Sequence, residues 1–172
     1  IIVSEKIAKR IGGRPIEVLA ASLTSGNFEP GFIDMTFEDI TWRAAQEAYH
    51  MAGLGPDEID FAEVHDCFTI AEILRVEGLG FCKRGEMVRW IDEVINEIGG
   101  RKPINPSGGL LGKGHPLGAT GVAQIREIVL QLRGAAGLRQ IEGARVGLAH
   151  NRGGSVTGTE GAACTVTILR KP

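Results

Sequence analysis

Residues 108–118, GGLLGKGHPLG, place one histidine inside a run of glycines. His115 lies between Gly114 and Pro116, and Gly118 follows closely. Glycine frees the backbone to adopt conformations that other residues avoid and lets another group come close. A histidine used only for packing needs no such backbone, whereas one that must reach a reacting atom does. The segment therefore predicts a functional histidine at position 115, and a histidine that only caps a loop is the alternative.

Cys67 is a second candidate, within the tetrapeptide HDCF at residues 65–68. This tetrapeptide joins a predicted strand to a predicted helix. If Asp66 caps that helix, Cys67 lies in the first turn, where the helix dipole favours a thiolate. A buried cysteine that only packs explains the tetrapeptide alone equally well.

A third candidate segment is HNRGGS, residues 150–155, which follows another predicted strand. Gly153 and Gly154 would leave backbone N–H groups free to bind an oxyanion. Taken alone, a glycine-rich hairpin is the better interpretation. The case for a site is that all three segments follow a strand or precede a helix, where reactive groups gather in layered α/β folds.

The hydrophobic pattern predicts an alternation of strands and helices that would position these segments. Strands are expected at residues 1–4, 15–24, 58–66, 144–150 and 162–169, and helices at 5–13, 36–53, 67–80, 85–100 and from Pro116 onward. Thr36 begins a T-x-x-D capping signal, and Pro116 suits the first turn of a helix. Alternating elements followed by a terminal β pair indicate a layered α/β domain.

Two of these helices carry apolar residues that predict their buried faces. The helix after HDCF places Ile70, Ile73 and Leu74 on one face. The helix after Pro116 has a stripe formed by Val122, Ile125, Val129 and Leu132.

Composition narrows the class of protein. The chain has 172 residues, 43% hydrophobic and 23% charged, with a net charge of −2, which fits one globular domain and argues against nucleic acid or an anionic membrane as partner. No apolar stretch approaches the roughly 20 residues of a membrane span. Three cysteines without a CxxC pair, in a chain with no secretory signal, predict reduced thiols and a cytoplasmic location.

Other motifs fail on spacing. A Walker A loop needs Ser or Thr after Gly-Lys, but Gly114 follows Lys113. The dinucleotide pattern G-x-G-x-x-G fails because Leu117 stands at its third glycine. His65 and Cys67 have no second pair of ligands at usable spacing, so no metal site is expected.

NPSGGLLGKGHPLGATG, residues 105–121, closely resembles the catalytic-histidine loop in the C-terminal half of thiolases. HDCF, where most thiolases have Asn-Glu-Ala-Phe, and GLAHNRGG at residues 147–154 resemble the sterol-carrier-protein type of thiolase and its bacterial and archaeal relatives. The resemblance extends over nearly the whole chain. It implies an α/β thiolase-fold C-terminal domain with a layered, mixed five-stranded sheet flanked by helices.

The resemblance also implies roles for the candidate residues. His115 would activate a nucleophilic cysteine and help to bind a thioester oxygen. The usual second cysteine, in Cys-x-Gly, is replaced by Asn151-Arg152-Gly153, so Cys67 would act as acid/base. His65 would take the oxyanion-binding place of the usual asparagine, and Asn151 and Gly153 would line the same place through the backbone.

Further expectations concern the substrate. Coenzyme A would be a substrate, with no cofactor, and Asp66, Gly114 and Gly118 would contact it or the acyl group. Cys82 and Cys164 match no catalytic position, and Cys164 is expected in the core.

The same resemblance divides the chain and predicts partners. IIVSEKIAKR resembles the closing strand and helix of the N-terminal thiolase half, so residues 1–14 would be a remnant of that half and residues 15–172 the C-terminal domain. The nucleophilic cysteine belongs to the N-terminal half, so the isolated chain should not transfer acyl groups. The expected partners are that half, further copies in a dimer or tetramer, and a zinc-ribbon/OB-fold accessory protein.

The expected reaction is cleavage of a 3-oxoacyl-CoA by coenzyme A, or the reverse Claisen condensation. One alternative is a retro-aldolase of the same fold that acts on a CoA thioester. Such relatives use tyrosines, whereas this chain has only Tyr49, in a predicted helix. The other alternative is a non-catalytic subunit, which would need neither His115 nor Cys67.

Overall fold

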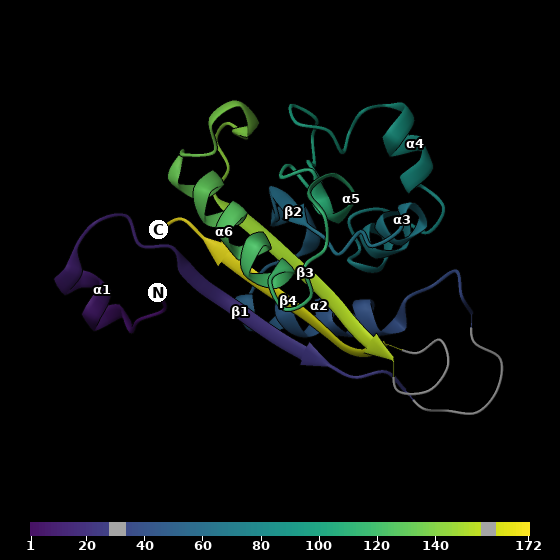
Figure 1. Cartoon of the computed structure of the whole chain (residues 1–172), viewed down its shortest axis with the longest axis horizontal. Coiled ribbons are helices and arrows are strands. Elements are labelled where there is room, and N and C mark those ends of the chain that lie inside the picture. The colour runs from purple at the N-terminus through teal and green to yellow at the C-terminus, as the bar shows by residue number, and fades with distance from the viewer. Residues whose placement is uncertain (28–33, 156–160) are drawn as a thin grey trace.

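The computed structural model describes residues 1–27, 34–155 and 161–172. Its sheet has the strand order β1-β4-β3-β2, in which β4 is antiparallel to both neighbours and β2 is parallel to β3 (Figure 1). The strands are β1 (Glu17–Thr24), β2 (Phe61–Glu63), β3 (Val146–Ser155) and β4 (Gly161–Arg170).

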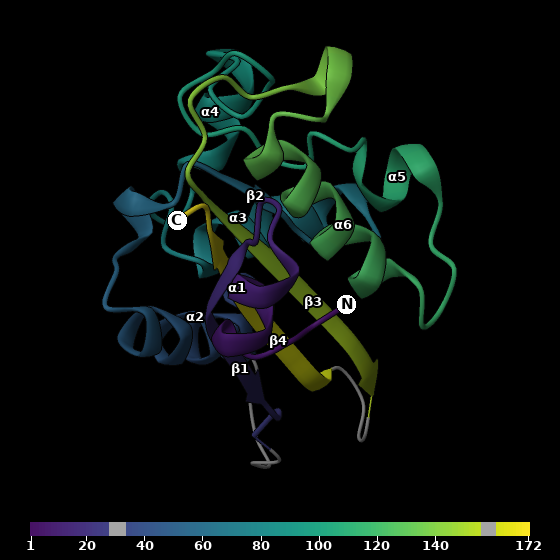
Figure 2. The ribbon, with the colours of Figure 1, turned by 90° about the vertical axis from the view of Figure 1, so that its left-hand side faces the viewer.

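Helices cover both faces of this sheet. Figures 1 and 2 show α2 on one face and α6 on the other, and in Figure 1 α3, α4 and α5 lie on the side of the sheet where β2 is. The helices are α1 (Glu5–Ile11), α2 (Asp39–Ala52), α3 (Thr69–Gly78), α4 (Met87–Asp92), α5 (Gly109–Lys113) and α6 (Thr120–Arg133), with 3-10 turns at Pro56–Glu58 and Gly137–Arg139. The predicted layered α/β fold is confirmed.

The described residues form four strands rather than the five predicted. Residues 1–4 are not a strand. Next to β2, Ile104 makes only an isolated parallel bridge to Ala62. Pro103 and Pro106 flank this bridge and lack the N–H groups that would extend it, so a fifth strand does not form there.

Several element ends differ from the prediction because their capping signals are used elsewhere. The Thr36 hydroxyl bonds to the Asp34 carboxylate at 2.6 Å, and α2 begins only at Asp39. Pro116 precedes α6, which begins at Thr120. The helix predicted for residues 85–100 ends at Asp92, β2 is limited to residues 61–63, and β3 continues to residue 155.

The α2 face of the sheet holds the larger core. Cys164, Val166 and Ile168 alternate along β4 and point to this face, as period-2 patterning requires. They pack against α2 residues such as Ala44 and Ala48, both completely buried. The predicted core position of Cys164 is confirmed.

The α6 face has a smaller core, built around Phe61, Ile128 and Leu132. The stripe predicted for α6 is partly wrong, because Val122 is 72% exposed. The helix instead buries a row that is largely polar, formed by Thr120, Gln124, Glu127 and Gln131. In α3 the prediction also fails for Ile70, which is 58% exposed.

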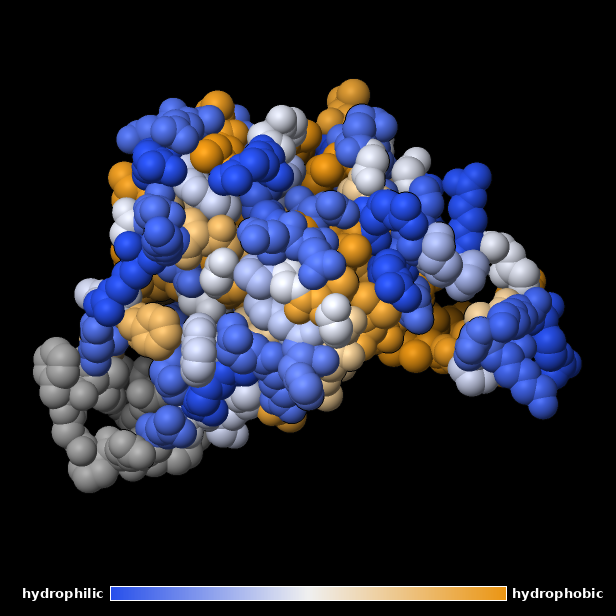
Figure 3. Space-filling model, turned by 180° about the vertical axis from the view of Figure 1, so that it is seen from behind, coloured by the Kyte–Doolittle hydropathy of each residue, from blue (hydrophilic) through white to orange (hydrophobic). Residues whose placement is uncertain are grey.

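The N-terminal residues and the outer surface complete the description. α1 has no buried residue and stands away from the sheet before β1 (Figure 1). The boundary at residue 14 stays a prediction. Seen from the α2 side, the surface is mainly hydrophilic with scattered hydrophobic patches (Figure 3). Among the described residues, no helix is long and apolar enough to span a membrane.

Candidate functional site

One pocket, about 520 Å³ in volume, gathers residues from all three segments singled out in the sequence. Among the described residues, Asp66 and Gly114 do not line it, although both were predicted to bind substrate. The lining residues are His65, Cys67, Arg75, His115, Leu117, Gly118, Thr120, Gly121, Asn151, Arg152, Gly153 and Gly154.

The parallel pairing of β2 with β3 brings the first and third segments together. Glu63 of β2 pairs with Ala149 of β3. His65 follows Glu63 by two residues, and Asn151 follows Ala149 by two residues. His65 Nδ1 lies 3.1 Å from Asn151 Oδ1. Residues 86 positions apart in the sequence therefore meet at the carboxyl end of β2.

A chain of hydrogen bonds fixes the tautomer of His65. Gln124 Nε2 donates to the His150 carbonyl at 3.0 Å, and Asn151 Nδ2 donates to Gln124 Oε1 at 3.2 Å. The chain ends at a carbonyl that can only accept, so Asn151 Oδ1 must accept from His65 Nδ1–H. The Nε2 atom of neutral His65 is consequently an acceptor.

His65 is neutral at physiological pH. Burial, assisted by the nearby charge of Arg75, lowers its pKa to about 4. The ring also stands edge-on to that of His115, with centroids 4.7 Å apart. The two imidazoles therefore lie against each other in one wall of the pocket.

His115 is held from the first residue of α6. Its Nδ1 lies 2.7 Å from the Thr120 hydroxyl, and that hydroxyl donates to the Pro116 carbonyl at 3.4 Å. The oxygen of Thr120 therefore accepts from His115 Nδ1–H, and Nε2 keeps the lone pair that can take up a proton. Gly114 and Gly118 on either side have φ of 87° and 81°, the left-handed region that favours glycine.

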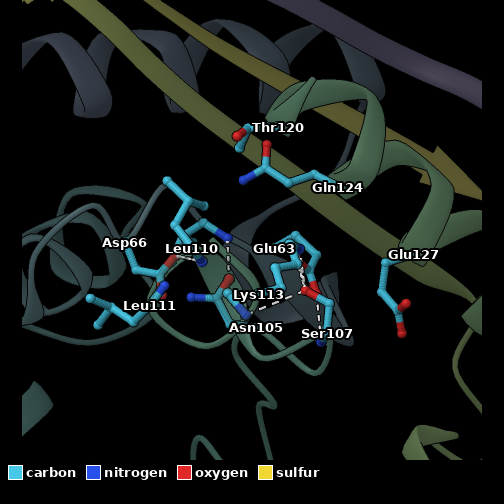
Figure 4. A network of polar contacts seen from close by, with 12 residues as sticks. Glu63, Asp66, Asn105, Ser107, Leu110, Leu111, Lys113, Thr120, Gln124 and Glu127 are labelled. Carbon is cyan, nitrogen blue, oxygen red and sulfur yellow. Dashed lines mark hydrogen bonds and ion pairs between the residues drawn. The ribbon is translucent and has the colours of Figure 1, made fainter. Parts of the chain in front are cut away.

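Asp66 does not cap α3, contrary to the prediction. That helix begins at Thr69, and Cys67 lies before it rather than in its first turn. The Asp66 carboxylate instead accepts from the backbone N–H of Leu110 at 2.6 Å and of Leu111 at 3.4 Å (Figure 4). Gly109 is required here, because a Cβ atom would lie 2.1 Å from Asp66 Oδ2.

A second polar cluster fixes the loop between β2 and α5 (Figure 4). Glu63 is completely buried and accepts from the backbone N–H and the hydroxyl of Ser107, at 3.0 and 2.6 Å. Lys113 Nζ forms an ion pair with Glu63 at 3.3 Å. Asn105 Oδ1 accepts from the Val64 N–H at 2.8 Å. HDCF and the glycine-rich loop are thus joined into one scaffold.

The third segment is a strand rather than the predicted loop. Asn151 and Gly153 lie within β3 and pair with Thr165 and Ala163 of β4. Gly154 has φ of 73° inside the strand. The middle of the connection, residues 156–160, lies outside the described residues. Gly153 and Gly154 line the pocket, and their role in binding an oxyanion stays a prediction.

The other two cysteines lie away from the pocket lining in the described part of the chain. Burial raises the pKa of Cys82 to about 12 and that of Cys164 to about 11. Cys164 Sγ lies 3.3 Å from Nε2 of the buried His150. Within residues 1–27, 34–155 and 161–172, no group of three or more His, Cys, Asp and Glu side chains is placed to hold a metal.

Sequence reasoning missed four residues that shape the site, namely Arg75, Thr120, Gln124 and Arg152. Thr120 and Gln124 belong to the polar row of α6, and this row repeats at helical spacing just after the His115 loop. That repetition was a usable signal. Arg75 and Arg152 carry no comparable signal, because arginines in a helix and after a strand are usually exposed.

This pocket lies between a parallel strand pair and the start of α6. Residues 32–169 match the family described as thiolase C-terminal domain-like, so the chain belongs to that family. It is 49% identical over 150 residues to an acetyl-CoA acetyltransferase of Methanothermobacter thermautotrophicus, a match covering 87% of this chain and 39% of the relative.

Further relatives confirm the resemblance to sterol-carrier-type thiolases. Sterol carrier protein 2 of Homo sapiens is 43% identical, with 99% of this chain and 31% of the relative covered. Benzoylsuccinyl-CoA thiolase subunit BbsB of Thauera aromatica is 37% identical, covering 96% and 44%. The chain thus spans less than half the length of these relatives.

A solved structure shares both the fold and part of the sequence. It is the Ltp2-ChsH2(DUF35) aldolase, with a TM-score of 0.83 and 27% identity. The match covers 98% of this chain and 43% of that chain.

Proposed function

We propose that this chain is the C-terminal catalytic portion of a thiolase-type acyltransferase that cleaves 3-oxoacyl-CoA with coenzyme A, or runs the reverse condensation. The observation that carries the proposal is the single pocket lined by His65, Cys67 and His115 in a member of the thiolase family. Coenzyme A is the substrate, and the chemistry needs no cofactor.

His115 serves as the base that activates the nucleophilic cysteine of the N-terminal half. Its anchored Nδ1–H leaves Nε2 as the proton acceptor, which is the form required of a general base. Cys67 exchanges the proton on the acetyl carbon. The exposed Gly118, beside Thr120 in the pocket wall, leaves room for the thioester close to His115.

His65 supports the thioester oxygen indirectly. An oxyanion needs hydrogen-bond donors, but neutral His65 offers an acceptor at Nε2 because its single N–H, at Nδ1, donates to Asn151 Oδ1. His65 therefore reaches the oxygen through a water molecule that donates one hydrogen to Nε2 and the other to the oxygen. The backbone N–H of Gly153 is the direct donor in this proposal.

The proposed partners follow from the family resemblance and from the greater length of the relatives. The nucleophilic cysteine comes from an N-terminal half, and the greater length of the relatives supports this. The proposal includes a dimer or tetramer of the complete enzyme, located in the cytoplasm. It also includes an accessory chain. The solved aldolase whose name joins Ltp2 to ChsH2(DUF35) supports an accessory chain.

A retro-aldolase is the second candidate, because a solved aldolase shares the fold at 27% identity. Tyr49 argues against it. This tyrosine is buried in α2, and its hydroxyl donates to the Leu79 carbonyl at 2.8 Å. Burial raises its pKa far above the ordinary value. The only tyrosine of the chain is therefore bound to the core rather than placed in the pocket.

The test uses the complete enzyme, assembled from this chain and its N-terminal half, with 3-oxoacyl-CoA and coenzyme A. His115→Ala should keep the parental melting temperature, because the residue is exposed, and should lower turnover by about 10² or more. Parental turnover in this variant would remove His115 from the mechanism. Cleavage of 3-hydroxyacyl-CoA without thiolysis would favour the aldolase, and no activity on either substrate would favour a non-catalytic subunit.

Cys67 is tested separately by deuterium exchange into acetyl-CoA. Cys67→Ala should lose exchange while acyl-enzyme formation continues, and Cys164→Ser, altered in the core, is the control. Unchanged exchange in Cys67→Ala would assign the acid/base role elsewhere. The isolated 172-residue chain, given radiolabelled acyl-CoA, should form no stable acyl-enzyme.

A further inference from the structure

Arg75 is a buried arginine that also forms part of the pocket wall. It lies on α3, and its side chain is only 3% exposed. Burying a guanidinium is costly unless partners compensate for its charge. The groups that contact Arg75 therefore indicate what this side chain does.

Two groups contact the guanidinium from different sides. Arg75 Nη1 donates to Cys67 Sγ at 3.5 Å. Arg75 Nε lies 3.4 Å from Glu38 Oε2 as an ion pair, although no well-aligned hydrogen-bond acceptor for this Nε is found among the described residues. The arginine thus links the carboxylate that precedes α2 to the sulfur that precedes α3.

The carboxylate does not neutralise the cluster. Arg152 Nε lies 3.9 Å from Glu38 Oε1, so one carboxylate serves two guanidinium groups. Glu38 also accepts from the Thr41 hydroxyl at 2.8 Å. Both arginines line the pocket, and the unbalanced positive charge favours an anion there.

The neighbouring histidines add no positive charge of their own. Burial and then the charge of Arg75 lower the pKa of His65 and of the completely buried His150. Two groups could be the anion that this pocket wall favours, namely the Cys67 sulfur and a substrate oxygen. Of these, the Cys67 sulfur is the one that contacts Arg75 in the structure.

We propose that Arg75 is a positioning residue that donates to the Cys67 sulfur and so holds it in the pocket. The inference rests on the acid/base role proposed for Cys67. In that role the C–H bond of the acetyl group breaks and an S–H bond forms. The carbon–hydrogen electron pair passes to the thioester carbonyl, which becomes an enolate.

The charged and titratable groups around Cys67 come from every element packed near it. Asp66 is its neighbour in sequence, but its carboxylate is bound to α5. The groups that face the pocket region are Glu38 before α2, Arg75 on α3, Arg152 on β3, His65 after β2 and His115 before α6.

The test measures the rate at which iodoacetamide alkylates Cys67 across a pH series, located by peptide mass spectrometry in the 172-residue chain. The reaction forms a C–S bond and releases iodide. Arg75→Met should slow the alkylation of Cys67 at neutral pH about tenfold. Arg75→Lys should restore most of the rate, and Glu38→Gln should speed the alkylation.

Cys82, which is not among the residues that line the pocket, is the internal control and should keep its own profile. A folded Arg75→Met chain with the parental Cys67 profile would overturn the proposal. If Arg75→Met does not fold, Glu38→Gln decides, and an unchanged or slower alkylation of Cys67 would overturn it. Alkylation needs no acyl-CoA, so this result is separate from success or failure of acyl transfer.

Discussion

The two faces of the sheet differ in what they bury. The α2 face buries a broad apolar cluster that extends from α2 through α3 to Trp90 of α4. The α6 face buries a small apolar cluster beside a polar row, and this row leads to the pocket through Thr120 and Gln124. Apolar burial gives the domain its stability, whereas the hydrogen-bonded row fixes the orientation of the histidines. Stability and chemistry are thus divided between the faces.

The division predicts the largest effect for a core truncation on the α2 face. Leu148 is completely buried in that cluster, so Leu148→Ala should lower the free energy of unfolding by about 2 to 5 kcal/mol. Urea unfolding of parent and variant measures this. A loss of unfolding free energy below about 1 kcal/mol would be smaller than core Leu→Ala substitutions give, and would show that the α2 face is not the stabilising one.

An intermediate effect is expected from pH at the polar face. The folded pKa of His65, about 4, lies below its ordinary value of 6.5. Above pH 6.5 His65 is neutral in both the folded and the unfolded chain. As the pH falls from 6.5 to 4, the unfolded chain takes up a proton that the folded chain does not. The free energy of unfolding should therefore fall by up to about 3 kcal/mol.

His65→Asn removes this titration and serves as the matched variant. Its unfolding free energy, measured in urea at pH 7, 5.5 and 4, should fall less than that of the parent, while the buried His150 is present in both proteins. Parallel curves for the two proteins would rule out His65 as the source of the acid sensitivity.

The smallest effect is expected on the outer side of α6. Val122 is 72% exposed, so Val122→Ser should change the stability of the isolated chain by no more than about 0.5 kcal/mol. The same denaturant titration measures it. A loss comparable to that of Leu148→Ala would mean that the outer side of α6 is packed, and the contrast between the faces would disappear.

The sequence was most informative where the signal is local and periodic. The apolar runs predicted β1, β3 and β4 within a few residues, and the glycine-rich loop pointed to His115 without any structure. The predicted helix starts failed at Thr36 and Asp66 because their side chains bind Asp34 and the backbone of α5 instead of capping a helix. The helix predicted from Pro116 begins at Thr120. Such choices depend on tertiary contacts, which single-sequence patterns do not contain.

Buried polar groups were the least predictable part of the site. Gln124 and Arg75 are almost completely inaccessible, yet both residue types are usually exposed in helices. Their burial depends on acceptors supplied by distant segments. Gln124 donates to the His150 carbonyl, and Arg75 forms an ion pair with the Glu38 carboxylate. Only the assembled fold places those acceptors.

The contact between Asp66 and α5 has a consequence for how the sequence can change over time. The carboxylate occupies the space where a side chain at position 109 would start, 2.1 Å from its Cβ, and it binds the next two backbone N–H groups. A larger residue at position 109 is excluded while Asp66 is present. Loss of Asp66 leaves those amides without their acceptor. Positions 66 and 109 should therefore covary across relatives rather than drift independently.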